Sequence, residues 1–120
     1  MPDNNEVLLM LYDGAISFLS RAIEAFEAQN HEDTSRFIIR TQNIISELKG
    51  ALKMEYEVAQ SLYQLYDYFN RRLTEANEKQ DRLPVYEVQG YLKELRGAWA
   101  EAMVKVGETA APPDAVGVGV

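Results

Sequence analysis

The chain has 120 residues, of which 47% are hydrophobic and none is cysteine, and its formal net charge at pH 7 is −7. This length suits one domain with a single core, and the lack of cysteine excludes a disulfide framework, a thiol nucleophile and a cysteine-ligated zinc site. The negative charge repels phosphate backbones, so we expect no nucleic-acid binding. An apolar run of about 18 residues and a basic signal-peptide region are both missing, which predicts a cytoplasmic protein without membrane insertion.

The first predicted element is a helix from about Asn4 to Gln29. Asp3 is a suitable N-cap, and Glu6 three residues later completes a pattern similar to a capping box. At about 100° per residue, the apolar side chains form a core stripe and a flanking group. Together they span an arc wide enough to contact both the rest of the fold and a partner helix. The stripe comprises Leu8, Leu11, Tyr12, Ala15, Ile16, Leu19, Ala22, Ile23 and Phe26, and the flank comprises Val7, Met10, Gly14 and Phe18.

Two further helices are predicted between residues 32 and 79. Asn30 and His31 interrupt the first pattern, and Glu32 and Asp33 favour a new helix start. Residues 53–57 contain neither Gly nor Pro, so no local signal marks a turn there. We place one because a continuous helix could not bury both apolar stripes in one globule of this size. The stripes are Phe37, Ile38, Thr41, Ile44, Ile45, Leu48, Ala51 and Leu52, then Val58, Ala59, Leu62, Leu65, Tyr66, Phe69, Leu73 and Ala76.

A fourth helix is predicted to begin near Pro84, because proline suits the first turn of a helix. From Gly107 onward the density of Gly and Pro is typical of a flexible tail. Four amphipathic helices with short connections predict an all-α fold: an antiparallel up-and-down four-helix bundle over residues 1–106, followed by a flexible tail over 107–120. The fourth stripe comprises Val85, Val88, Tyr91, Leu92, Leu95, Trp99, Ala102 and Met103.

Candidate catalytic residues are scarce. The chain has a single histidine, His31, at a predicted loop. Di-iron bundles need Glu-x-x-His pairs on two helices, which one histidine cannot supply. Glycine-rich nucleotide motifs are missing, and the carboxylates alternate with Lys and Arg as on a solvated surface. We therefore predict a protein that is not an enzyme and that holds no cofactor and no metal.

Apolar side chains outside the core stripes are the main positive signal for function. The chain has seven tyrosines, a residue enriched where an apolar surface meets water. One interpretation is that the tyrosines close the edges of the bundle with their hydroxyls in water. Taken together with the wide arc of the first helix, they favour grooves that accept partner helices. The predicted partner-binding residues are Val7, Met10, Gly14, Phe18, Ile39, Tyr56, Tyr63, Tyr68 and Tyr86.

Several short motifs occur in a specific order and spacing between Val7 and Met103. In this order they resemble the flagellin-specific export chaperones of bacterial flagella. The motifs are Leu8–Ile16, Ile44–Leu48, Leu65–Phe69, Arg71–Asn77, and Glu94–Arg96 followed by Trp99.

This resemblance implies a helical bundle and a function that composition alone does not supply. Such chaperones bind the disordered C-terminal segment of flagellin in the cytosol, prevent its premature polymerisation and support its delivery to the export apparatus. They hydrolyse no nucleotide. Coupled folding of a client segment in an apolar groove fits the spare apolar surface predicted above. The flagellin C-terminal segment is thus the expected partner.

Two features leave alternatives open. Family members usually carry a longer N-terminal segment that is implicated in contact with the export gate, whereas six residues precede Val7 here. Either the chain is shortened or this member lacks that contact. The alternative function is a helical adaptor that binds a flagellar regulator or another flagellar protein. The tail from Gly107 matches no family pattern, so its role is open.

Overall fold

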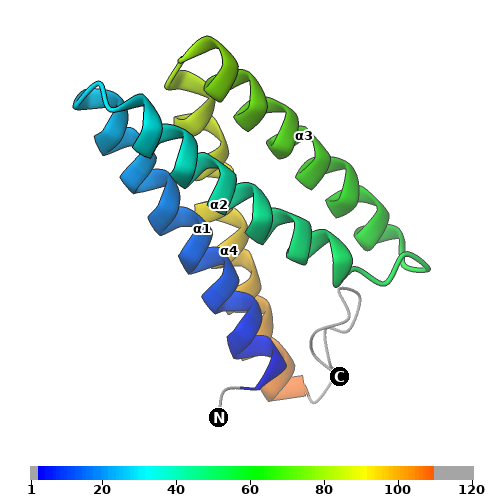
Figure 1. Cartoon of the computed structure of the whole chain (residues 1–120). Helices are drawn as coiled ribbons and strands as arrows, with labels where there is room; N and C mark the ends of the chain where they lie inside the picture. The colour runs from blue at the N-terminus through cyan, green and yellow to red at the C-terminus, as the bar shows by residue number, and fades with distance from the viewer. Residues whose placement is uncertain (1–2, 110–120) are drawn as a thin grey trace.

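The computed structural model describes residues 3–109, and side chains up to residue 104. Within this range the chain forms four α-helices and no strand: α1 (Asn4–Glu27), α2 (His31–Gly50), α3 (Glu57–Lys79) and α4 (Leu83–Thr109). Consecutive helices run antiparallel, and α1 and α3 each pack against both α2 and α4 (Figure 1). The structure confirms the predicted all-α four-helix bundle. Within the same range, no helix combines the length and apolarity needed to cross a membrane.

The helix ends follow local chemistry that the sequence shows directly. Asp3 caps α1, because its side-chain Oδ1 accepts a hydrogen bond from the Glu6 backbone N–H at 2.8 Å. Asn30 caps α2 by accepting from the backbone N–H of Asp33 at 3.0 Å. Pro84 lies in the first turn of α4, where its missing N–H costs no helical hydrogen bond. These starts agree with the predicted ones.

The connection between α2 and α3 is present although it contains neither Gly nor Pro. Residues 51–56 leave the helical conformation, and Tyr56 precedes α3 without a side-chain capping bond. The turn therefore forms because folding back buries both apolar stripes, not because of local turn residues. The prediction made on that tertiary ground is confirmed.

The end of α4 differs from the predicted boundary. The helix continues through Thr109, so residues 107–109 of the segment expected to be a tail are helical. Glycine at 107 weakens a helix by about 1 kcal/mol relative to alanine but does not end it. The next proline, at 112, is the first residue that excludes a regular helix interior. The rest of the predicted tail, residues 110–120, lies outside the described residues.

The core is built from the predicted stripes of all four helices. Tyr12, Tyr66 and Phe69 are its largest fully buried side chains. The other buried apolar residues of the core cluster are Leu8, Ala15, Leu19 and Ala22 of α1, Ile38, Ile45 and Leu48 of α2, Leu62, Leu73 and Ala76 of α3, and Val85, Val88 and Leu92 of α4.

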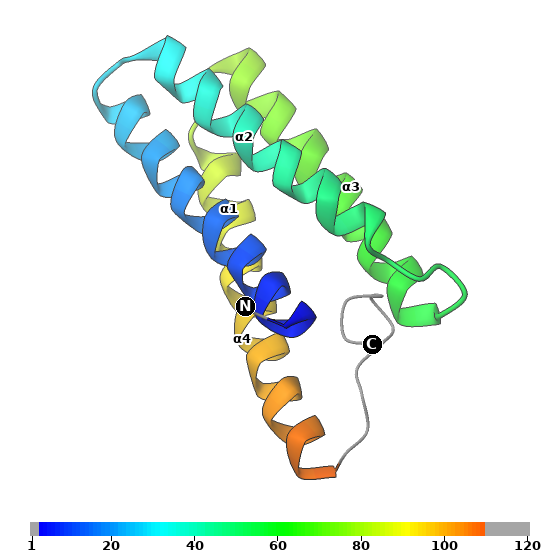
Figure 2. The ribbon, with the colours of Figure 1, turned by 60° about the horizontal axis from the view of Figure 1, so that its bottom comes forward.

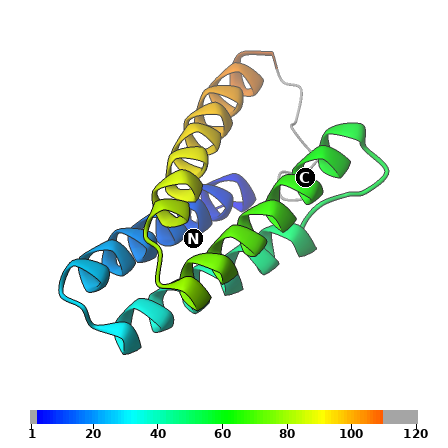
Figure 3. The ribbon, with the colours of Figure 1, turned by 90° about the horizontal axis from the view of Figure 1, so that it is seen from above.

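Two predicted core residues are exposed, while several others are partly buried. Val58 is 49% exposed and Tyr91 is 41% exposed, although each continues the apolar stripe of its helix. Tyr91 stacks on Phe69 of α3, and Val58 lies at the start of α3; the helices α3 and α4 diverge as they leave the 80–82 connection (Figure 2; Figure 3). Helical periodicity places a side chain on the inner face, but it does not guarantee that a neighbouring helix reaches it.

Candidate functional site

One end of the bundle is closed by contacts between α3 and α4. Arg72 Nε donates to Glu87 Oε1 at 2.7 Å, and the Tyr68 hydroxyl donates to Glu87 Oε2 at 2.6 Å. Phe69 and Tyr91 stack with their ring centroids 5.7 Å apart. The Tyr68 hydroxyl and then the Arg72 guanidinium lower the pKa of Glu87. These groups join residues 68–72 to residues 87–91 beside the connection.

The two connections at this end also contact each other. His31 Nδ1, at the start of α2, donates to Gln80 Oε1 at 2.6 Å. Gln80 adopts a left-handed backbone conformation (φ 51°) after α3, and its side-chain Nε2 donates back to the Asn77 carbonyl at 2.6 Å. The single histidine of the chain thus has a structural contact at the end of the bundle.

A hydrogen-bonded trio crosses the middle of the bundle. The hydroxyls of Tyr12 and Tyr66 hydrogen-bond to each other, and Trp99 Nε1 donates to the Tyr12 hydroxyl at 3.1 Å. Burial raises the pKa of both tyrosines, so both remain neutral over the physiological range. The trio joins α1, α3 and α4 at one level and fixes the orientation of the Trp99 indole.

At the level of this trio, α4 follows α1 while α3 follows α2. Arg96 Nε donates to Asp13 Oδ1 at 2.9 Å, which holds the middle of α4 against α1. Lys49 Nζ donates to Asp67 Oδ1 at 2.7 Å, which holds α3 against α2. The same bond lowers the pKa of Asp67 and raises that of Lys49. The two pairs of helices therefore separate at the end opposite the 80–82 connection (Figure 1).

This separation leaves an apolar surface between α3 and α4, which we call the open face. Leu65, Leu95 and Trp99 pack on the core but are only half-buried, whereas Val58 and Tyr91 are exposed. Because α3 and α4 are antiparallel, Leu65 lies at the level of Leu95 on the opposite helix. The open face consists of Val58, Leu65, Leu95 and Trp99, whereas the stack of Tyr91 on Phe69 belongs to the closed end. The sequence assigned all four residues of the open face to the core, and only their incomplete burial identifies them as surface.

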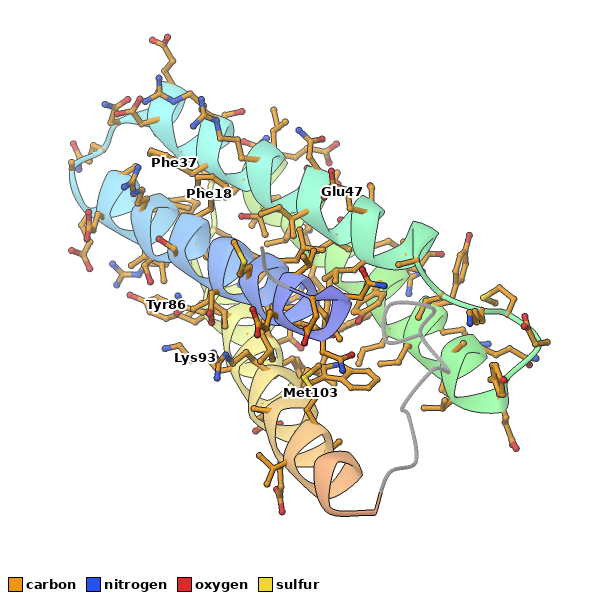
Figure 4. The ribbon with its side chains drawn as sticks, turned by 90° about the horizontal axis from the view of Figure 1, so that it is seen from below. Phe18, Phe37, Glu47, Tyr86, Lys93 and Met103 are labelled. Atoms are coloured by element: carbon orange, nitrogen blue, oxygen red, sulfur yellow. The ribbon has the colours of Figure 1, made fainter. Side chains whose placement is uncertain are left out.

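The predicted flank of α1 is divided between packing and exposure. Phe18 stacks on Phe37 of α2 with ring centroids 6.1 Å apart (Figure 4). A Cβ atom added at Gly14 would lie 3.3 Å from Ile44 Cδ1, so the glycine permits close approach of α1 and α2. Val7 and Met10 are exposed. The flank thus combines two residues used by the bundle with two that are free to contact a partner.

The other predicted partner-binding residues lie on separate faces. Ile39 is exposed on α2, and Tyr56 and Tyr63 are exposed at the start of α3, with Lys49 Nζ 4.6 Å from the Tyr63 ring centroid. Tyr86 is exposed on the side of α4 that is turned away from α3 (Figure 4). Tyr68 is half-buried against Glu87. The nine predicted residues therefore do not form one groove.

Catalytic geometry does not emerge from the described residues. Across residues 3–109, no group of three or more His, Asp or Glu side chains is arranged to hold a metal ion. The hollows on the bundle are shallow and open. One of them, between α1 and α4, is lined partly by the apolar residues Leu9, Met103 and Val104. The arrangement provides apolar surface for a macromolecular partner.

Comparison with known proteins agrees with these features. The family described as flagellar protein FliS matches residues 2–106. The flagellar secretion chaperone FliS of Bacillus subtilis is 40% identical over 98 residues, covering 82% of this chain and 74% of that protein. The Salmonella typhimurium chaperone of the same name is 36% identical over 104 residues, covering 84% and 77%. The Escherichia coli chaperone is 32% identical over 102 residues, covering 82% and 75%.

Proposed function

Because this chain belongs to the FliS family of flagellar secretion chaperones, we propose that it binds the C-terminal segment of flagellin in the cytosol before export. The bound segment is kept from polymerising and is delivered to the export apparatus, with the export gate as a second partner. The chain does this by binding alone and catalyses no reaction.

The observation that carries this proposal is the distribution of exposed apolar side chains over all four helices. Met10 on α1, Ile39 on α2, Tyr63 on α3 and Tyr86 on α4 are each between 39% and 59% exposed. A single straight helix cannot contact all of these faces. A disordered segment that folds into several short helices around the bundle can contact them in turn.

Coupled folding also suits a chaperone that must release its client. Such binding typically buries about 1,000–3,000 Å² and uses several kcal/mol to order the segment. Contacts spread over several faces can then be broken one at a time at the export apparatus. A client held this way is protected in the cytosol without becoming a permanent subunit.

The test is calorimetric titration with a peptide from the C-terminal region of the cognate flagellin. We expect sub-micromolar affinity, a gain of helical circular dichroism and a negative heat-capacity change from apolar burial. Added salt should weaken binding only modestly, because the proposed contacts are apolar. Lack of binding at tens of micromolar peptide would favour the adaptor function, with a flagellar regulator or another flagellar protein as partner.

The proposed surface is tested with the single variants Met10→Ala and Tyr63→Ala. Each should weaken binding by upward of about 2 kcal/mol if its side chain is an anchor. Each should change the free energy of unfolding by no more than about 0.5 kcal/mol, because both side chains are exposed. Glu78→Ala, at an exposed charged position near the end of α3, is the control and should leave the affinity unchanged. Tight binding that neither variant weakens would reject the site while keeping the function.

A further inference from the structure

Three of the seven arginines of the chain gather around two phenylalanine rings on α1 and α2. Phe18 and Phe37 stack across these two helices (Figure 4). Arg21 Cζ and Arg36 Cζ lie 5.7 and 5.2 Å from the Phe37 ring centroid. Arg40 Cζ lies 5.8 Å from the Phe18 ring centroid. These distances fall within the range of cation–π attraction, and we call the five residues the arginine–phenylalanine cluster.

The positive charge of this cluster is only partly balanced within the bundle. Arg36 forms an ion pair with Asp33 at 2.6 Å. Arg21 and Arg40 make no ion pair with any residue of 3–104, although acidic residues outnumber basic ones by 19 to 12 in the whole chain. Arg36 and Arg40 are also four residues apart on α2, a spacing at which like charges repel. Two guanidinium groups are therefore left to pair with carboxylates from outside the chain.

The geometry of the cluster suits the recognition of a carboxylate. A guanidinium over an aromatic ring uses its face in that contact, and its N–H donors lie in the plane around its edge. Arg21 and Arg40 are exposed, so these donors are accessible to a partner. Two parallel N–H donors match the two oxygens of a carboxylate. Contact with the ring also restricts the arginine before binding, which lowers the entropy lost when the pair forms.

A shallow hollow adjoins the cluster between the end of α1 and the start of α2. Ala25, Ala28 and Phe37 supply its apolar lining, and Arg21 lines it as well. Glu24 lines the same hollow and makes no ion pair with any residue of 3–104. An apolar side chain of a partner fits this hollow, whereas the charge of Glu24 opposes a partner carboxylate at this point.

We infer that the arginine–phenylalanine cluster binds a protein segment in which Asp or Glu carboxylates flank an apolar side chain. The carboxylates pair with Arg21 and Arg40, and the apolar side chain lies in the hollow against Phe37. A short protein segment fits better than nucleic acid, because the net charge of −7 repels a continuous phosphate backbone. The inference concerns the chemistry of a partner segment and does not depend on flagellin being the client.

The test titrates the full chain, labelled with nitrogen-15, with the capped peptide Ser-Glu-Glu-Leu-Glu-Glu-Ser while nuclear magnetic resonance follows the arginine Nε–Hε signals. The signals of Arg21 and Arg40 should shift, and the fitted affinity should be at least about tenfold higher than for the peptide with Gln at every Glu position. Added salt should weaken binding, because the charges are exposed. Equal affinity for the two peptides, or no shift at millimolar acidic peptide, would overturn the inference. Tighter binding of polyuridylate than of the acidic peptide would overturn it in favour of nucleic acid.

Matched variants locate the binding surface. The double variant Arg21→Gln with Arg40→Gln should weaken binding of the acidic peptide by about tenfold or more. Arg71→Gln is the control, because Arg71 is also exposed and lies over an aromatic ring, with its Cζ 6.0 Å from the Tyr68 centroid on α3. It should leave the affinity unchanged.

Glu24→Gln should tighten binding of the acidic peptide by about two- to threefold, because it removes a carboxylate from the hollow. Circular dichroism and urea unfolding check that every variant is folded, and Glu24→Gln gives a result even if the double arginine variant is not. Equal weakening by Arg71→Gln would show that only overall charge acts, and weaker binding by Glu24→Gln would place the peptide elsewhere. Either result would contradict the inference.

Discussion

The two ends of this bundle are built from the same kind of apolar stripe but differ in what holds them. Near the 80–82 connection, α3 and α4 are joined by the Arg72–Glu87 ion pair, the Tyr68–Glu87 hydrogen bond and the stack of Phe69 on Tyr91. Farther from that connection, at the level of the Tyr12–Tyr66–Trp99 trio, α4 is held by α1 and α3 is held by α2, as the bonds Arg96–Asp13 and Lys49–Asp67 show. The open face lies between them.

The closed end and the open end therefore have different roles: the first stabilises the fold, and the second leaves apolar surface accessible. At the closed end Phe69, Leu73, Val85 and Val88 are fully buried, so these residues contribute most to stability. At the open end the same residue types are partly in contact with water, so they contribute less to stability and retain surface for another segment. The Tyr12–Tyr66–Trp99 trio lies at the boundary between the two regions.

The largest expected effect compares two leucines of α3 that lie eight residues apart. Leu73 is fully buried at the closed end, so Leu73→Ala should lower the free energy of unfolding by about 2–5 kcal/mol. Leu65 is half-buried on the open face, so Leu65→Ala should cost less than half as much. Urea unfolding followed by circular dichroism measures both. Equal losses would show that the open face is as tightly packed as the closed end.

An intermediate effect is expected at the trio. Tyr12→Phe removes the acceptor of Trp99 Nε1 and the partner of the Tyr66 hydroxyl, leaving one buried and one partly buried polar group without that bond. An unsatisfied buried group typically costs about 1–3 kcal/mol. Tyr66→Phe should cost less, because the Tyr12 hydroxyl keeps its bond from Trp99. Urea unfolding gives both values, and Trp99 emission should change with Tyr12→Phe. The reverse order of stability would contradict this assignment.

The smallest effect is a pH dependence confined to the closed end. The Tyr68 hydroxyl and Arg72 lower the pKa of Glu87 in the folded state. A lowered folded pKa contributes stability above the unfolded value, about 4.3, and this contribution is lost as pH falls through the folded pKa. Glu87→Gln should therefore be less stable than the parent chain at pH 7.

Other carboxylates titrate in the same range, so the measured quantity is the difference in unfolding free energy between the two chains. That difference should shrink as the pH falls below the unfolded pKa of about 4.3 and should vanish below the lower folded pKa of Glu87, where both side chains are uncharged. A difference that stays constant from pH 7 to pH 3 would show that the carboxylate charge at 87 has no role in closing this end.

Much of the fold follows from short-range sequence features. Asp3 begins α1 through its cap, Asn30 begins α2 in the same way, and Pro84 fits the first turn of α4. These features act over three or four residues, so a single sequence is sufficient to recognise them. The 51–56 connection could be predicted only from the need to pack both apolar stripes in one core, because its residues carry no turn signal.

The candidate site was less accessible from sequence. Periodicity separated the flank of α1 from its stripe, but Phe18 is used in a stack with Phe37, while Met10 remains exposed. Tyr68 was expected at a partner surface, and its hydroxyl instead donates to Glu87 within the bundle. Whether these residues also contact a partner stays a prediction. A side chain on a helix flank is packed or free according to how close the next helix comes.

The sequence by itself determined the number of helices, most of their limits and the stripes that form the core. Those properties depend on local hydrogen bonding and on a 3.6-residue period that one chain displays. The family was indicated separately, by the order and spacing of short motifs that resemble its members. Only the tertiary structure decided which end of each stripe is covered. The burial of each stripe depends on the angles between the helices. Contacts between residues far apart in the sequence maintain these angles: Arg96 and Asp13 are 83 residues apart, and Lys49 and Asp67 are 18 residues apart. Val58 has the pattern of a core residue but is exposed at the start of α3, the end at which α3 and α4 have diverged.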